Sequence, residues 1–156
     1  MFVPVDRSNL WQAAGIHSVS WQASHRALCA PDFIALHTPE RQEAYVRRKM
    51  SEGSRFYLLV EKKPVGIVSV RGSLIEDLYV LPAEQRKGYG TRLLEFAVGQ
   101  CTGLPTLWIL ENNTGAERLY RRLGFQRTGR VQAVTDGLAE IELAYPREDA
   151  GMGNCV

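Results

Sequence analysis

The chain has 156 residues, of which 45% are hydrophobic, and this length favours one domain with a sizeable core. Nineteen basic and seventeen acidic residues leave a net charge of +2, too small to indicate binding to nucleic acid or to an anionic membrane. Three cysteines without paired spacing indicate neither a disulfide framework nor a zinc site. Because no long apolar stretch or signal-peptide layout is present, we expect a soluble cytoplasmic protein.

Hydrophobic spacing and turn residues predict the elements in chain order. The first half is expected to hold a strand, two helices and an antiparallel meander of three strands: Phe2 to Val5, Asn9 to about Arg26, Pro39 to Met50, Arg55 to Glu61, Pro64 to Arg71 and Leu74 to Leu81. Cys29 to Thr38, between the two helices, is expected to be irregular. The second half is expected to hold helices at Tyr89 to Cys101 and Thr114 to Leu123, and strands at Thr106 to Leu110, about Phe125 to Val134, and Leu138 to Tyr145.

Two connections in the second half carry topological information. The helix between Leu81 and Thr106 implies a right-handed crossover between parallel strands. Asp136-Gly137 favours a tight hairpin between the last two strands. The predicted fold class is therefore α/β (α+β), with a mixed, mostly antiparallel sheet, one parallel strand pair at its centre, and flanking helices. We expect a single domain over residues 1–146 and a flexible tail over 147–156.

The most informative segment is Gln85-Arg86-Lys87-Gly88-Tyr89-Gly90, between a predicted strand and a predicted helix. Glycines let the backbone approach an anion, while the unpaired N–H groups and positive dipole end of the helix favour negative charge. Open α/β sheets also place their ligands at the carboxyl ends of parallel strands. The segment lacks the pattern of a nucleotide-hydrolysing loop and fits a dinucleotide fingerprint poorly. It nevertheless predicts a site for a phosphate-containing ligand.

At this junction the chain resembles the GNAT superfamily of acetyl-coenzyme A-dependent N-acetyltransferases. The family signature of an apolar strand, Val-x-Pro and Gln/Arg-x-x-Gly-x-Gly/Ala corresponds to Leu78 to Gly90. A second family element, Asn-x-x-Ala-x-x-x-Tyr-x-x-x-Gly-Phe, corresponds to Asn113, Ala116, Tyr120, Gly124 and Phe125. The order of elements also matches over about residues 2 to 145. The resemblance implies a GNAT-type fold with a splayed central strand pair, acetyl-coenzyme A as acyl donor, and no metal.

The resemblance also implies which residues bind the cofactor. Backbone N–H groups from Arg86 to Thr91 would hold the pyrophosphate, and the backbone around Tyr79 and Val80 would bind the pantetheine arm. The Val80 N–H would polarise the acetyl carbonyl. Asn113 would bind the arm or order the following helix, and a plain helix N-cap is the alternative. The full expected set is Tyr79, Val80, Gln85, Arg86, Lys87, Gly88, Tyr89, Gly90, Thr91 and Asn113.

The implied reaction is direct attack of a primary amine on the thioester carbonyl. The departing thiolate needs a proton or charge stabilisation, and the resemblance places Tyr120 beside the sulfur as general acid. A core role on the apolar stripe of its helix is the alternative for Tyr120. Glu76 and Asp77 are adjacent on a strand and are expected to point to opposite faces. We favour Glu76 as the general base because it shares a nominal face with Val80; a strand bulge would reverse this assignment, and solvated surface charge is the alternative for both carboxylates.

The acceptor site is expected to involve the first two helices and the terminal hairpin, with Trp21, His25, Phe33 and Tyr45 as candidate substrate-binding residues. His25 is also a candidate for a second base. The acceptor is a small-molecule or peptide amine: a polyamine, an amino acid, a peptide terminus and a lysine side chain all remain open. We expect no nucleic acid or membrane partner, and either a monomer or a homodimer. A non-catalytic acyl-coenzyme A sensing domain, acyl transfer to a hydroxyl, and transfer of a longer chain are the alternatives.

Overall fold

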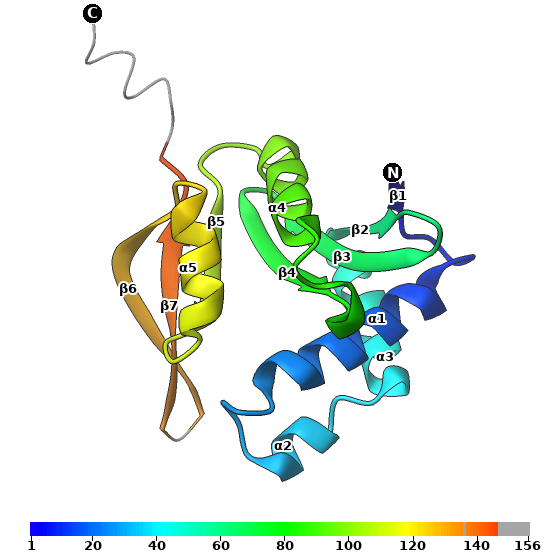
Figure 1. Ribbon diagram of the computed structural model, residues 1–156, viewed down its shortest axis with the longest axis horizontal. Coiled ribbons are helices and arrows are strands. Elements are labelled where there is room, and N and C mark those ends of the chain that lie inside the picture. Colours follow the sequence, from blue (N-terminus) through cyan, green and yellow to red (C-terminus); the bar gives the residue numbers. More distant parts are fainter. Residues whose placement is uncertain (136, 147–156) are drawn as a thin grey trace, which may run out of the picture. The chain divides into compact units, whose positions relative to one another are not determined.

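The computed structural model describes residues 1–135 and 137–146, and Figure 1 shows their elements. The chain divides into two compact units. The first comprises Met1–Arg71 and Ile75–Gln100, and the second comprises Gly72–Leu74 and the chain from Cys101 onward. The single domain over 1–146 stays a prediction. The predicted tail over 147–156 and Asp136 of the predicted hairpin lie outside the described residues.

The first unit contains four neighbouring strands in the order β1-β2-β3-β4, of which β1–β2 and β2–β3 are antiparallel. The strands are β1 (Phe2–Pro4), β2 (Arg55–Val60), β3 (Pro64–Arg71) and β4 (Leu74–Val80), whose first residue belongs to the second unit. The helices are α1 (Leu10–His25), α2 (Pro31–Ala35), α3 (Pro39–Ser51), the 3-10 turn η1 (Pro82–Glu84) and α4 (Tyr89–Gln100).

Two adjacent residues of β3 show which helices cover each face of these strands. Ile67 belongs to a buried apolar cluster with side chains of α1, α3 and β2. Gly66 faces α4, because a Cβ at this position would lie 2.8 Å from the Leu93 Cδ1 atom. Since adjacent strand residues point to opposite faces, α1 and α3 cover one face and α4 covers the other. On the α4 side, Phe2 stacks on Phe96 with ring centroids 4.0 Å apart.

The second unit consists of β5 (Thr106–Leu110), α5 (Thr114–Arg122), β6 (Gln126–Thr135) and β7 (Leu138–Ala144). β7 lies between the other two strands and pairs antiparallel with both. The Asn113 side chain caps α5 by accepting from the Ala116 N–H at 3.2 Å. Gly124 ends the helix with a φ of +107°, the left-handed conformation that favours glycine at this position.

The structure adds two short helical segments to the predicted elements. α2 forms within Cys29 to Thr38, which the sequence predicts to be irregular, and η1 precedes the glycine-containing loop. Pro31 starts α2 at a position where its fixed φ suits a helix. Tertiary contacts then hold the segment, because the Ser18 and Gln22 side chains of α1 donate to the His37 carbonyl at 2.6 and 2.7 Å. Local periodicity cannot reveal such contacts.

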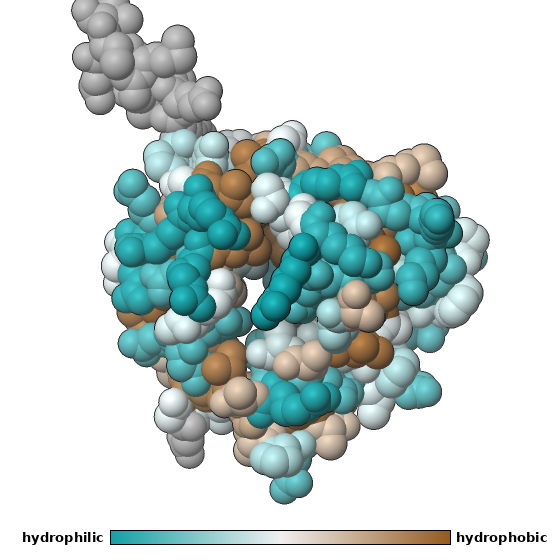
Figure 2. All heavy atoms as spheres, in the orientation of Figure 1, coloured by the Kyte–Doolittle hydropathy of each residue, from teal (hydrophilic) through white to brown (hydrophobic). Residues whose placement is uncertain are grey.

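Surface polarity and helix length bear on membrane contact. Figure 2 shows hydrophilic residues over most of the visible face, with smaller apolar areas between them. None of the helices in the described part of the chain is long and apolar enough to cross a membrane.

Candidate active site

The loop between η1 and α4 has the backbone geometry of an anion site. Arg86 and Gly88 have φ values of +66° and +83°, in a region that residues other than glycine seldom adopt. A Cβ at Gly88 would meet no atom within 4 Å, so the space beside this backbone is open. The Gly88 carbonyl accepts from the Arg92 N–H at 3.2 Å and so begins α4. The N–H groups of residues 89–91 therefore lie in the first helical turn, where intrahelical acceptors are lacking.

Side chains around this loop anchor it and set its charge. Gln85 Nε2 donates to the Val80 carbonyl at 3.3 Å and thereby ties the loop to the end of β4. Lys87 Nζ pairs with Glu84 at 3.2 Å, so its charge is partly neutralised. Within residues 1–135 and 137–146, the exposed Arg86 forms no ion pair. The loop thus presents one unneutralised cation beside the first turn of α4.

Asp77 lies at the centre of a buried hydrogen-bond network on the α1 and α3 face of the first unit. Its Oδ1 atom is 2.8 Å from His17 Nε2, and Ser69 Oγ donates to Oδ2 at 2.7 Å. The Tyr45 hydroxyl lies 3.2 and 3.3 Å from the two oxygens. Burial alone raises the pKa of Asp77, but hydrogen bonds from these three side chains, first of all from His17, outweigh it and lower the pKa below its ordinary value. Asp77 is therefore held as a carboxylate.

His17 is fixed in one tautomer by its two neighbours. Gln42 Nε2 lies 2.7 Å from His17 Nδ1, and an amide N–H can only donate, so Nδ1 carries the lone pair. His17 Nε2 then carries the proton that is donated to Asp77. Both ring nitrogens are engaged and the side chain is buried, as expected for a core histidine.

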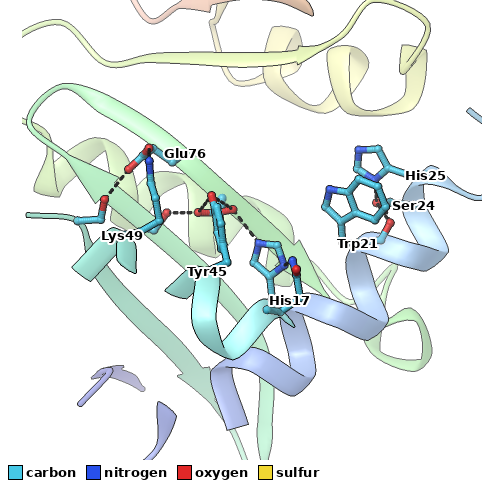
Figure 3. Close-up of polar contacts among 11 residues, drawn as sticks. His17, Trp21, Ser24, His25, Tyr45, Lys49 and Glu76 are labelled. Carbon is cyan, nitrogen blue, oxygen red and sulfur yellow. Dashed lines mark hydrogen bonds and ion pairs between the residues drawn. The ribbon is translucent and has the colours of Figure 1, made fainter. Parts of the chain in front are cut away.

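Glu76 is also surrounded by donors (Figure 3). Lys49 Nζ lies 2.5 Å from Glu76 Oε2, and Ser54 Oγ donates to Oε1 at 2.6 Å. Arg71 approaches Oε2 at 3.8 Å. The carboxylate is 9% exposed, so it is not a solvated surface charge.

The two adjacent carboxylates do not separate to opposite sides as predicted. Glu76 contacts Lys49 and Asp77 contacts Tyr45, and both partners lie on α3, one turn apart. The alternation of side chains along a regular strand therefore does not indicate which of the two carboxylates is the general base. Contact with α3, rather than nominal strand face, determines the surroundings of both.

Three of the four predicted acceptor-site residues meet in one aromatic cluster, Trp21, His25 and Phe33, together with His37. His25 and His37 stack on Trp21 with ring centroids 4.1 and 3.5 Å away and interplanar angles of 7° and 11°. Two rings at these distances cannot share one face of the indole, so the imidazoles cover opposite faces. Phe33 meets Trp21 edge-on at 5.8 Å. Tyr45, the fourth predicted residue, lies apart in the Asp77 network.

The two imidazoles of this cluster share one tautomer. His25 Nδ1 is 2.9 Å from the Trp21 carbonyl oxygen, and His37 Nδ1 is 3.1 Å from the Phe33 carbonyl oxygen. A carbonyl only accepts, so Nδ1 carries the proton in each ring. Burial lowers the pKa of both histidines below the ordinary value. Both imidazoles are therefore neutral at pH 7.

The second unit holds two further predicted residues. Tyr120 is buried, with its ring 6.0 Å from that of Phe125. Burial raises the pKa of Tyr120 to about 12, so the hydroxyl stays protonated at neutral pH. Asn113 is the N-cap of α5, as its alternative role predicted.

Sequence reasoning missed several members of these networks. Gln42, Ser69 and His37 join through contacts between distant segments, and no local pattern identifies them. One signal was present on α1, because His17, Trp21 and His25 follow each other at four-residue spacing and therefore share a helix face. This spacing could have indicated that the three rings act together.

Comparison with known proteins agrees with these features. Residues 52–127 match the Acetyltransferase (GNAT) domain family. The peptidyl-lysine N-acetyltransferase YjaB of Salmonella typhimurium is 32% identical over 90 residues, which cover 55% of this chain and 60% of that protein, less than two-thirds of its length. YjaB of Escherichia coli is 29% identical over 119 residues, covering 73% of this chain and 79% of that protein.

The fold is shared more widely than the sequence. The crystal structure of the PaiA N-acetyltransferase of Thermoplasma acidophilum in complex with coenzyme A superposes with a TM-score of 0.72 at 15% identity, covering 94% of this chain and 98% of that one. This likeness confirms the predicted fold class, a GNAT-type mixed sheet flanked by helices. Together with the family match over residues 52–127, it makes the chain similar to the GNAT acetyltransferases both in the sequence around the loop before α4 and in fold.

Proposed function

We propose that this protein transfers an acetyl group from acetyl-coenzyme A to a primary amine. The observation that carries the proposal is the loop at Arg86 and Gly88, whose positive φ values and open space leave the first turn of α4 free to receive a phosphate. The pyrophosphate of coenzyme A would bind there, with Arg86 supplying a cation. The backbone around Tyr79 and Val80 would bind the pantetheine arm, and the Val80 N–H would polarise the thioester carbonyl.

The reaction would then need a general acid for the thiolate and a general base for the amine. As the amine nitrogen bonds to the carbonyl carbon, the carbon–sulfur bond breaks and the thiolate departs. Tyr120 is protonated at neutral pH and would donate to this thiolate. Asn113, which caps α5, would also contact the pantetheine arm. The sequence predicts Glu76 as the base that removes the amine proton.

For the acceptor we propose a lysine side chain of a peptide or protein. The support is the likeness to two proteins named peptidyl-lysine N-acetyltransferases. Trp21, Phe33 and Tyr45 would contact the acceptor, since the edge of the Trp21 indole and the Phe33 ring suit the methylene chain of lysine and a tyrosine hydroxyl can accept from its nitrogen. A cytoplasmic location, where acetyl-coenzyme A and such substrates meet, belongs to the same proposal.

A thermal shift measurement with ligands tests the cofactor assignment. Coenzyme A should raise the melting temperature, because it binds the folded state, while NAD or ATP at equal concentration should raise it much less. Gly88→Glu should abolish the coenzyme A shift by filling the open space with a like charge. Gly88→Ala is the matched control, because it carries the same backbone strain at φ +83° without the charge or bulk. An unchanged coenzyme A shift in Gly88→Glu would remove the loop from the site.

Product analysis tests the activity. The protein should release free thiol from acetyl-coenzyme A in the presence of a lysine-containing peptide, and mass spectrometry should locate the acetyl group on the lysine nitrogen. A panel with spermidine and free amino acids separates a peptide acceptor from a small-molecule acceptor. Coenzyme A binding without thiol release across the panel would favour the non-catalytic sensing domain.

A further inference from the structure

We propose that His25 is the general base of the acetyl transfer and that its Nε2 atom accepts the proton of the attacking amine. This inference rests on the proposed function and assigns a step within it. It replaces the strand carboxylate with an imidazole of α1 that belongs to the aromatic cluster.

The first argument is that both strand carboxylates are already occupied. Glu76 accepts from Lys49 and Ser54 at 2.5 and 2.6 Å and faces Arg71. Asp77 accepts from three side chains on its two oxygens. These donors already occupy both carboxylates, and they hold the pKa of Asp77 below its ordinary value. Either residue would have to lose its partners before it could act as a base.

The second argument is that His25 is held in the orientation that a base requires. Its Nδ1 atom donates to the Trp21 carbonyl at 2.9 Å and lies 2.8 Å from Ser24 Oγ (Figure 3), and its ring stacks on the indole. The neutral ring therefore carries its lone pair on Nε2. Among the described residues, His25 Nε2 has no hydrogen-bond partner. A fully buried side-chain polar atom without a partner occurs among them only at Ser20 Oγ. The Nε2 atom is therefore not fully buried, and solvent reaches it.

The third argument concerns position and charge. The His25 ring lies 6.5 Å from the ring of Tyr79, the residue that precedes Val80 on β4. The ionisable groups that face it are His37 across the indole, His17 on the same helix, and Tyr79 on β4. Within the described chain no carboxylate bonds to the ring, so nothing there holds it as an imidazolium. Burial keeps the imidazole neutral and ready to accept at pH 7.

The proton balance fixes the timing of the step. A free ammonium ion with a pKa of about 10.4 would not yield its proton to an imidazole, so the amine must bind as the free base. The nitrogen becomes positive and acidic as its bond to the carbonyl carbon forms. His25 Nε2 then takes that proton, the carbon–sulfur bond breaks, and the thiolate takes a proton from Tyr120. The imidazolium then gives its proton to water, and Tyr120 recovers a proton from water.

A pH profile of acetyl transfer to a lysine peptide tests the assignment. Below the pKa of His25, a plot of log kcat/KM against pH should have a slope of about 2, because both the amine and the base must lose a proton. Above that pKa only the amine must lose a proton, so the slope should be about 1. His25→Gln should lower kcat by about 10²-fold or more and show a slope of about 1 throughout. His37→Gln is the matched control, because that imidazole stacks on the same indole with the same tautomer, and it should keep the break in slope.

The other outcomes overturn the proposal. If His25→Gln keeps the change of slope in the pH profile, His25 is not the base. If Glu76→Gln loses that change of slope, Glu76 is the base instead. If the wild-type protein acetylates no probe, the proposed function fails, and the state of His25 is then decided separately by ¹⁵N NMR of the histidine rings. The spectra should show a neutral Nδ1–H tautomer that titrates below the ordinary histidine pKa. An Nε2–H tautomer would overturn the assignment whatever the activity.

Discussion

Replacing Asp77 should be among the most destabilising single changes in the first unit. Asp77→Ala removes the acceptor shared by His17, Ser69 and Tyr45, and leaving buried donors unpaired costs about 3–5 kcal/mol of the free energy of unfolding. Asp77→Asn keeps the shape and one oxygen, so it should cost about 1.5–3 kcal/mol, the value of a hydrogen bond to a charged group. For a chain of this size each kcal/mol lowers the melting temperature by about 2–4 °C.

Urea unfolding monitored by circular dichroism measures these costs, with Glu43→Ala as control. Glu43 forms an exposed pair with Arg47 one turn away at 3.0 Å, so its loss should cost less than about 0.5 kcal/mol. Because the folded-state pKa of Asp77 is lowered, its contribution is present above the unfolded pKa and is lost as pH falls through the folded value. The difference between wild type and Asp77→Asn should therefore shrink below about pH 4. A cost below about 1 kcal/mol for Asp77→Ala at pH 7 would refute the network as a source of stability.

Three further outcomes are expected. Tyr120→Phe should lower the single-turnover rate constant by about 10²-fold or more and leave coenzyme A affinity and the melting temperature near wild type. A folded variant that keeps most of the wild-type rate would contradict the general-acid role. Gly124→Ala should destabilise the protein by about 1–2 kcal/mol, because φ is +107° and the new Cβ would lie 3.3 Å from Tyr145. Gly15→Ala, in an open helix interior, should stabilise the protein by up to about 1 kcal/mol. Equal denaturation midpoints for the two variants would contradict this expectation. The free energy of unfolding should fall as pH drops below about 6.5. The imidazoles of His25 and His37 have lowered pKa values in the folded state, so the unfolded chain takes up protons first. A melting temperature that stays constant between pH 5 and 7 in scanning calorimetry would exclude this linkage.

Most of the fold follows from local sequence. Pro64–Arg71 and Thr106–Leu110 are strands with the predicted bounds, because turn residues limit them and apolar residues fill them. The missed helix Pro31–Ala35 is too short for a periodic signal and is held by contacts with α1.

The site divides in the same way. The loop at Arg86 and Gly88 is predictable because backbone conformation and a helix start are encoded within a few adjacent residues. The partners of Asp77 are not, since His17 lies sixty positions away in sequence and meets it only when α1 packs on β4. The surroundings of Glu76 and Asp77 likewise depend on α3, which no strand pattern describes.

The short segment Gly72–Leu74 has a consequence for the order of folding. It is enclosed in sequence by the first unit, yet its carbonyls accept from the Thr102 and Thr106 N–H groups of the second unit at 3.0 and 2.9 Å. A ribosome releases this turn well before its partners, and bringing them together from an open chain costs loop-closure entropy. Folding of β3, β4 and α4 first fixes the chain on both sides of the turn and shortens the loop that remains to be closed. Prior folding of the first unit therefore favours assembly of the second, and a fragment starting at Cys101 would lack two of its own backbone acceptors.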